Sequence, residues 1–276
     1  MYIINTHSKN ISHAGNQQGS LAEFNRDDPS ETTRRISQEQ ALAILLGLLF
    51  TDGCVSPKKG SYRIYFANKH FALVGLFQQC MLNAFSMHSP NVLIGLTTDG
   101  LHRAIVNSKS IGSYLVETFG TFRTLRFTTG DLPNAHLPIQ FLHKTASVNL
   151  FLQAAFSADG GICFYPAKRN GKRGGTTWLI RTVFLACAHL ELRKNYMTLL
   201  RSLNIPAREV VKDGKIKIET QHGIQVFAGL IGFAKGSKVT SHSKYWDGRD
   251  KNEVLSFVLD SYNNPAKYYS LNLFER

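Results

Sequence analysis

The sequence predicts an α+β fold built as a pseudo-twofold tandem repeat, in which each copy reads helix, two strands, helix, two strands, helix (αββαββα). Three observations lead to this prediction. Two apolar runs without a charged residue lie far apart in the chain, and each stops at an Asp-Gly pair. The segments that follow the two runs match each other in composition and order. A further Asp-Gly pair recurs at the corresponding place of each copy, so the chain contains an internal repeat.

Each copy begins with a helix that must be buried on nearly every side. Residues 41–51 (ALAILLGLLFT) and 150–158 (LFLQAAFSA) contain no charged side chain, as a helix with apolar neighbours all round requires. Ser37 stands before the first run and is a favoured N-cap residue. The sequence therefore predicts one core helix in each copy.

The second helix of each copy begins at matching positions. Residues 66–73 (FANKHFAL) align with residues 185–192 (LACAHLEL), which places His70 and His189 at the same point of the repeat. A role at the helix start is expected for both histidines, rather than catalysis. The last helix of each copy is predicted from the amphipathic pattern that ends at Gly120 and Gly232.

Paired strands are expected between these helices. Residues 98–101 and 212–215 each hold an Asp-Gly pair between strand-like runs, the signature of a tight two-residue hairpin. The second copy also carries an insertion, residues 167–177 (AKRNGKRGGTT), which we interpret as a longer basic hairpin loop.

The repeat divides the chain into four parts. Residues 1–36 are polar, without helical or strand periodicity, and are expected to form a loosely held arm. Residues 37–132 form the first repeat, residues 133–146 a linker, and residues 147–276 the second repeat.

The charge balance indicates a polyanionic partner. Lys and Arg number 32 against 19 Asp and Glu, which gives a net charge of +13 and a pI of about 9.7. Hydrophobic residues make up 43% of the chain, as in a globular protein. Nucleic acid is therefore the first partner to consider.

The cysteines and the hydropathy pattern bear on the compartment. Four single cysteines without a CxxC pair favour neither a zinc module nor a disulfide framework. No run is long and apolar enough to span a membrane, and the N-terminus lacks the apolar core of a signal peptide. We expect a soluble intracellular protein in a reducing compartment, either the cytoplasm or an organelle whose genome encodes it.

The two Asp-Gly pairs that end the core helices differ from ordinary turns by their context. A small residue, Gly47 or Ala154, lies five positions before each acid and would let two helices pack side by side. Asp52 and Asp159 would then meet at the C-terminal helix ends, where the macrodipole disfavours negative charge. Such a pair needs a counter-charge, most simply a divalent cation.

Residues 45–53 (LLGLLFTDG) and 152–160 (LQAAFSADG) resemble the two namesake motifs of a monomeric LAGLIDADG homing endonuclease. The resemblance extends from about residue 37 to the C-terminus. Ala154 replaces the usual first glycine, and Phe50 and Ser157 replace the sixth-position acid, at positions that are structural in the family. The resemblance implies a saddle of two four-stranded antiparallel sheets over DNA, and site-specific cleavage of both strands across the minor groove.

The resemblance also implies that Asp52 and Asp159, with Gly53 and Gly160 beside them, bind divalent metal at the centre of the saddle. Phosphodiester hydrolysis needs a metal-activated water and a Lewis acid, and hard carboxylate oxygens suit Mg²⁺. Mn²⁺ is expected to substitute, and Ca²⁺ to bind without supporting cleavage. Because one chain holds both unequal repeats, a monomer on an asymmetric target of about 20 base pairs is expected.

Family members place a basic residue near each scissile phosphate, just after the third helix of each repeat. Lys238 holds this position in the second copy, and Arg126 in the first, where a lysine is more usual. Both are candidate catalytic residues, and a solvated surface charge is the alternative for each.

Strand alternation and loop position predict the side chains that face DNA. In residues 215–219, for example, the two isoleucines face a core and the charged residues face outward. Arg208 and Lys212 are expected to alternate in the same way on the preceding strand. The expected DNA contacts are Lys58, Lys59, Arg63, Tyr65, Lys168, Arg169, Lys172, Arg173, Arg208, Lys212, Lys215 and Lys217.

Two alternatives to the endonuclease remain on the same fold. One is an RNA-binding maturase that assists a host intron, and the other is a catalytically inactive DNA-binding regulator. Loss of either motif acid would favour them, whereas both acids are present. The terminal residues also lack the nucleophiles of an intein, so an intron-encoded or free-standing protein is expected.

Overall fold

The computed structural model describes residues 36–88, 91–122, 135–142, 144–169, 176–240 and 243–270, without the side chains of residues 145, 169 and 176. Among these residues, the first half contains three α-helices and four strands, in the order α1 (Gln38–Leu49), β1 (Gly53–Lys58), β2 (Ser61–Asn68), α2 (Phe71–Phe85), β3 (Leu93–Leu96), β4 (His102–Asn107) and α3 (Lys109–Phe119).

The second half repeats this order. Its elements are α4 (Thr145–Asp159), β5 (Gly160–Arg169), β6 (Thr176–Ala186), α5 (Leu190–Ser202), β7 (Arg208–Val210), β8 (Lys215–Ile218) and α6 (Gln221–Leu230). A further helix, α7 (Lys251–Asn263), and a 3-10 turn at Pro265–Tyr268 follow α6. Within the described residues, α7 has no counterpart in the first half.

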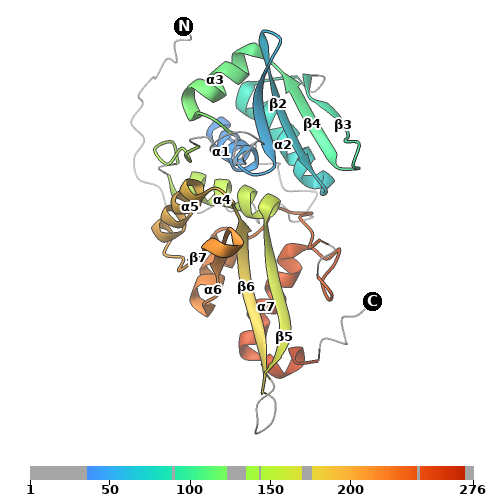
Figure 1. Ribbon diagram of the computed structural model, residues 1–276, viewed down its shortest axis with the longest axis vertical. Coiled ribbons are helices and arrows are strands. Elements are labelled where there is room, and N and C mark those ends of the chain that lie inside the picture. The colour runs from blue at the N-terminus through green and yellow to red at the C-terminus, as the bar shows by residue number, and fades with distance from the viewer. Residues whose placement is uncertain are drawn as a thin grey trace, which may run out of the picture.

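The described part of each half contains one antiparallel sheet of four strands. The strand orders are β1-β2-β4-β3 and β5-β6-β8-β7, so the two sheets have the same topology. The predicted α+β fold with a tandem αββαββα repeat is confirmed. Figure 1 shows the two halves end to end, with α1 and α4 between them.

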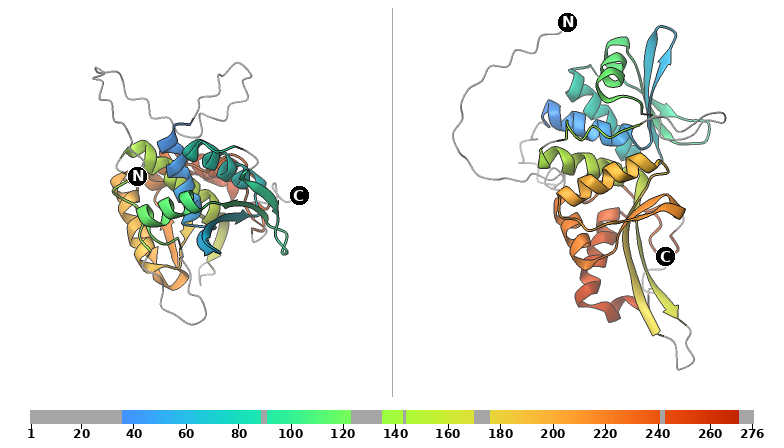
Figure 2. Two further views of the ribbon diagram at one scale, coloured as in Figure 1. Left: turned by 90° about the horizontal axis from the view of Figure 1, so that it is seen from above. Right: turned by 60° about the vertical axis from the view of Figure 1, so that its left-hand side comes forward.

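The sheets and the helices separate into layers. Figure 2 shows both sheets along one side of the molecule and most helices behind them. The buried side chains of both halves form one continuous hydrophobic cluster, which includes every residue of α1 from Ala41 to Leu49 except Gly47. The charge-free composition of this helix is explained by its position between the two halves.

Side-chain hydrogen bonds cap the first turns of α1 and α5. Ser37 forms a capping box with Gln40, in which the Ser37 hydroxyl accepts from the Gln40 N–H (3.2 Å) and the Gln40 side chain accepts from the Ser37 N–H (3.0 Å). His70 and His189 are the N-cap residues of α2 and α5, and the His189 ring accepts from the Leu192 N–H (3.3 Å).

The two Asp-Gly hairpins differ from the prediction. The connection between β3 and β4 covers residues 97–101, and the one between β7 and β8 covers residues 211–214 with a 3-10 turn, so neither is a two-residue turn. Gly100 and Gly214 adopt positive φ angles of 81° and 59°. Each glycine lies near the end of a turn of four or five residues and takes a backbone conformation that other residues rarely adopt.

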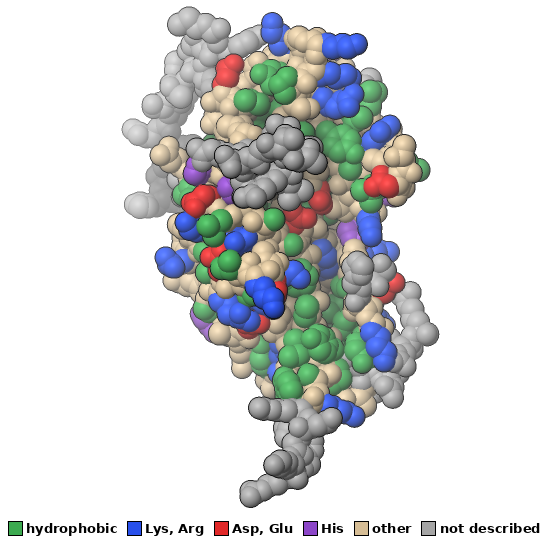
Figure 3. All heavy atoms as spheres, in the orientation of Figure 1, with side chains coloured by type: hydrophobic (Ala, Val, Ile, Leu, Met, Phe, Trp, Pro, Cys, Tyr) green, Lys and Arg blue, Asp and Glu red, His purple; other side chains and the backbone are tan. Residues whose placement is uncertain are grey.

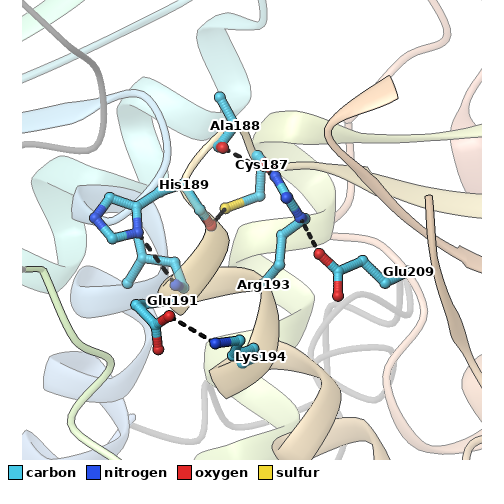
Figure 4. Close-up of polar contacts among 8 residues, drawn as sticks. Cys187, Ala188, His189, Glu191, Arg193, Lys194 and Glu209 are labelled. Carbon is cyan, nitrogen blue, oxygen red and sulfur yellow. Dashed lines mark hydrogen bonds and ion pairs between the residues drawn. The ribbon is translucent and has the colours of Figure 1, made fainter. Parts of the chain in front are cut away.

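A buried ion pair holds the connection between β6 and α5 (Figure 4). Arg193 is 4% exposed and donates to the carbonyls of Cys187 (2.7 Å) and Ala188 (2.9 Å) and to Glu209 on β7 (2.7 Å). By contrast, the Lys194–Glu191 pair is exposed. Arg193 therefore ties the start of α5 to the sheet of the second half.

No helix among the described residues is long and apolar enough to cross a membrane.

Candidate functional site

α1 and α4 lie in direct backbone contact at the centre of the molecule. A Cβ atom added at Gly47 would lie 2.4 Å from the Phe151 carbonyl oxygen and 2.8 Å from the Ala154 Cβ, and both distances are too short for real atoms. Only glycine fits at position 47, and the alanine opposite keeps the helices close. This contact brings the C-terminal ends of the two helices together.

The two motif acids meet at these helix ends. Asp52 lies in the turn after α1, Asp159 is the last residue of α4, and their carboxyl groups lie within hydrogen-bonding reach of each other. Asn68 at the end of β2 donates to the Asp52 carboxylate (2.6 Å). Burial raises the pKa of both acids, and the charge of Asp52 raises that of Asp159 further. Negative charge on both acids is therefore unfavourable without a compensating cation.

Sequence reasoning missed a third charged residue at this site, Lys251. It is the first residue of α7, is 3% exposed, and donates to the carbonyls of Ser157 (2.8 Å) and Gly160 (2.7 Å). Burial lowers its pKa to about 8, against the opposing effect of Asp159 and Asp52. A lysine in the first turn of a helix opposes the macrodipole, and this signal could have drawn attention to it.

An open cleft of about 660 Å³ lies beside the acids. Asp52, Asp159 and Lys251 line it, together with residues 160–165 of β5 and residues of the segment before α7. The end of α4 is anchored to that segment, because the Ser157 hydroxyl accepts from the Ala234 N–H (2.7 Å). The acids are thus accessible to a ligand while their backbone is fixed.

The donor atoms in the cleft suit a hard divalent cation. Two carboxylates from different helices adjoin in a half-open space, and oxygen donors of this kind are what Mg²⁺ and Mn²⁺ bind. Among the described residues, no cluster of three or more His, Cys, Asp or Glu is arranged to hold a metal. A bound ion would therefore depend on Asp52 and Asp159, and water or phosphate oxygens would complete its coordination.

Of the two basic residues expected near the acids, one can be placed. Lys238 is exposed, its backbone bridges to that of Asp250, and its backbone carbonyl accepts from the ring of His70. It is not among the residues that line the cleft. Arg126 lies outside the described residues.

The outer face of the second sheet carries basic side chains. Lys215 and Lys217 alternate with the buried Ile216 and Ile218 on β8. Lys215 lies over the ring of Phe184, 4.9 Å from its centroid. The sheet therefore presents basic side chains on its outer face and apolar side chains on the face toward the helices.

Arg208 belongs to the same face, since it lies opposite Lys217 in the β7–β8 register. It forms an ion pair with Glu219, which offsets its charge. Lys212 lies in the 3-10 turn and not on the strand where the sequence pattern placed it. Lys168 is exposed near the end of β5, whereas Lys172, Arg173 and the Arg169 side chain lie outside the described part of the chain.

The outer face of the first sheet follows the same alternation. Arg63 and Tyr65 alternate on β2 with the buried Ile64 and Phe66. Arg103 lies opposite Ala67 in the β2–β4 register, on this face, and sequence reasoning missed it, although the alternation with buried neighbours on β4 indicates it.

The ends of the β-ribbons differ between the halves. Lys58 ends β1 and Lys59 follows it with a positive φ of 43°, both exposed. On the longer β5–β6 ribbon, Tyr165 and Trp178 are each 41% exposed. Figure 3 shows hydrophobic side chains gathered over this ribbon, and Lys and Arg side chains scattered over both halves of the visible face.

Comparison with known proteins identifies the fold. No family model matches the sequence, and no curated protein matches it. The structure of the LAGLIDADG homing endonuclease I-SmaMI bound to cleaved DNA matches with a TM-score of 0.51 and 9% identity, over 85% of this chain and 93% of that chain.

Two further structures are similar. Variants of the homing endonuclease I-DmoI match with a TM-score of 0.49 and 14% identity, over 80% of this chain and 99% of that chain. The N-terminal LAGLIDADG domain of WhiA matches with a TM-score of 0.44 and 18% identity, over 76% of this chain and 92% of that chain. The chain therefore has the LAGLIDADG fold, as the match to I-SmaMI and the tandem topology show.

Proposed function

We propose that this chain is a site-specific endonuclease that hydrolyses both strands of a DNA duplex with the help of divalent metal. One observation carries the proposal: Asp52 and Asp159, one from each repeat, meet at the paired helix ends beside an open cleft. The fold it shares with homing endonucleases supports the proposal.

Each part of the site has a task in this proposal. Asp52 and Asp159 would hold Mg²⁺ or Mn²⁺, which when bound supplies a Lewis acid and an acidified water for phosphodiester hydrolysis. Asn68 orients the Asp52 carboxylate. Lys238, and Arg126 in the first repeat, would stabilise negative charge on the scissile phosphates.

The two outer sheet faces would contact the major groove on either side of the cleft. Their basic residues face away from the core, which suits phosphates and base edges. Because both sheets are on one chain, a monomer would cover an asymmetric target of about 20 base pairs. The domain boundaries at residues 36, 132 and 146 belong to the same proposal.

The test is a cleavage selection on a randomised duplex library with Mg²⁺. We expect the wild-type chain to cut both strands, and Asp52→Asn and Asp159→Asn to bind the selected duplex without cutting it. Asp99→Asn is the matched control, because Asp99 is exposed in the β3–β4 turn. This variant should cut the duplex as the wild type does.

Undiminished cutting by either motif variant would contradict the assignment of the acids. Sequence-specific binding without cutting by the wild type would indicate a DNA-binding regulator. Preference for intron RNA over duplex DNA would indicate a maturase.

A further inference from the structure

The position of Lys251 is costly and therefore needs a reason. A lysine that is 3% exposed loses its hydration, and the first turn of α7 presents a positive dipole end to it. Its ammonium is compensated by two carbonyl oxygens at the end of α4, those of Ser157 (2.8 Å) and Gly160 (2.7 Å). These bonds place a fixed positive charge at the negative end of that helix.

This charge also acts on the acid pair. Lys251 interacts electrostatically with Asp52 and with Asp159, and it lines the same cleft. Gly160 belongs to the metal site that the family resemblance implies, and its carbonyl already accepts a hydrogen bond from the ammonium. Lys251 thus stands where a divalent cation would find both its charge partners and a backbone ligand.

The first half of the site is built differently. The end of α1 is closed by the Thr51 hydroxyl, which donates to the carbonyls of Gly47 (3.0 Å) and Leu48 (2.9 Å). Asp52 receives its hydrogen bond from the neutral Asn68. Since α7 follows only the second repeat within the described residues, the fixed cation breaks the pseudo-twofold symmetry.

We propose that the Lys251 ammonium is a fixed internal cation of the acid pair, which competes with divalent metal and keeps the Gly160 carbonyl from binding it. This inference rests on the proposed function for the class of ligand. Its consequence is that removing the charge strengthens metal binding, whereas removing a merely structural contact would weaken it or leave it unchanged.

The experiment is a titration of the full chain with Mn²⁺ alone, without DNA. The electron paramagnetic resonance signal of the free ion measures how much Mn²⁺ is bound. We expect Lys251→Met to bind Mn²⁺ at least about tenfold more tightly than the wild type, because like charges at close range repel strongly. Lys251→Arg keeps the charge and should stay within about threefold. Lys244→Met is the control, because Lys244 lines the same cleft but is exposed and screened.

Equal or weaker Mn²⁺ binding by a folded Lys251→Met variant would overturn the inference. If Asp52→Asn and Asp159→Asn bind Mn²⁺ as tightly as the wild type, the proposed function is overturned instead. The two failures are therefore distinguishable.

A second measurement covers the case in which Lys251→Met folds poorly. Urea denaturation of the wild type, the two single variants and the Lys251→Met/Asp159→Asn double variant forms a double-mutant cycle. We expect Lys251→Met to lower the unfolding midpoint less in the Asp159→Asn background. In that background no Asp159 carboxylate is left without its positive partner when the ammonium is removed. The same loss in both backgrounds would overturn the inference.

Discussion

Gly47→Ala tests the contact between α1 and α4, and the structure determines the sign of its effect. In a helix interior, alanine is more favourable than glycine by about 1 kcal/mol. Against this, the new Cβ would lie 2.4 Å from the Phe151 carbonyl oxygen, when ordinary contact begins at 3.4 Å. The two buried helices would have to separate, and overpacking costs about 3 kcal/mol where the obstacle is backbone. We expect a net loss of about 2 kcal/mol in the free energy of unfolding.

The assay is equilibrium urea denaturation, read as a shift of the midpoint at constant slope. Gly75→Ala on α2 is the matched control, because a Cβ added there meets no atom within 4 Å. It should stabilise the chain by about 0.5–1 kcal/mol. A Gly47→Ala variant as stable as the wild type, or more stable, would refute the helix contact on which the site depends.

A companion variant identifies the atom responsible. Gly47→Ala combined with Ala154→Gly removes the side-chain clash of 2.8 Å but leaves the one with the Phe151 carbonyl. We therefore expect little recovery of stability, and full recovery would show that side chains alone set the helix spacing.

Three further predictions follow from other contacts. Arg193→Met should lower the free energy of unfolding by about 3 kcal/mol, because it leaves Glu209 and two carbonyls without their buried partner. Lys194→Met, which removes an exposed ion pair, should lower it by less than about 1 kcal/mol. Urea denaturation of the two variants compares these losses. Burial lowers the pKa of His70 from 6.5 to about 4, so the folded chain favours the neutral ring. The free energy of unfolding should therefore decrease as the pH is lowered from 6.5 to about 4, and it should decrease less in His70→Gln. If Lys217 contacts a phosphate, Lys217→Ser should flatten the plot of log binding constant against log salt by about 0.9, and an unchanged slope would remove it from the interface.

The sequence predicts those parts of the molecule whose pattern repeats. A charge-free run such as residues 41–51 predicts a helix surrounded by apolar groups, and residues 41–49 are buried between the two halves. The alternation of Lys215 and Lys217 with isoleucines likewise identifies the outer face of β8, because a strand presents successive side chains to opposite faces.

The remaining features depend on tertiary contacts that no local pattern encodes. For Lys251 the sequence offers at most an unfavourable lysine at a helix start, and only the contact of α7 with the end of α4 buries it beside Asp159. Lys212 was placed on a strand because charges alternate there, but the chain forms a 3-10 turn before Gly214 instead.

The most direct test of the central claim is an anomalous diffraction measurement on crystals of the chain with Mn²⁺ and the duplex recovered from the cleavage selection. The account predicts an anomalous peak between the Asp52 and Asp159 carboxylates, at coordination distance from an oxygen of each acid. Well-ordered carboxylates with no peak between them, or a peak elsewhere on the chain in its place, would contradict a metal-dependent site at the helix ends.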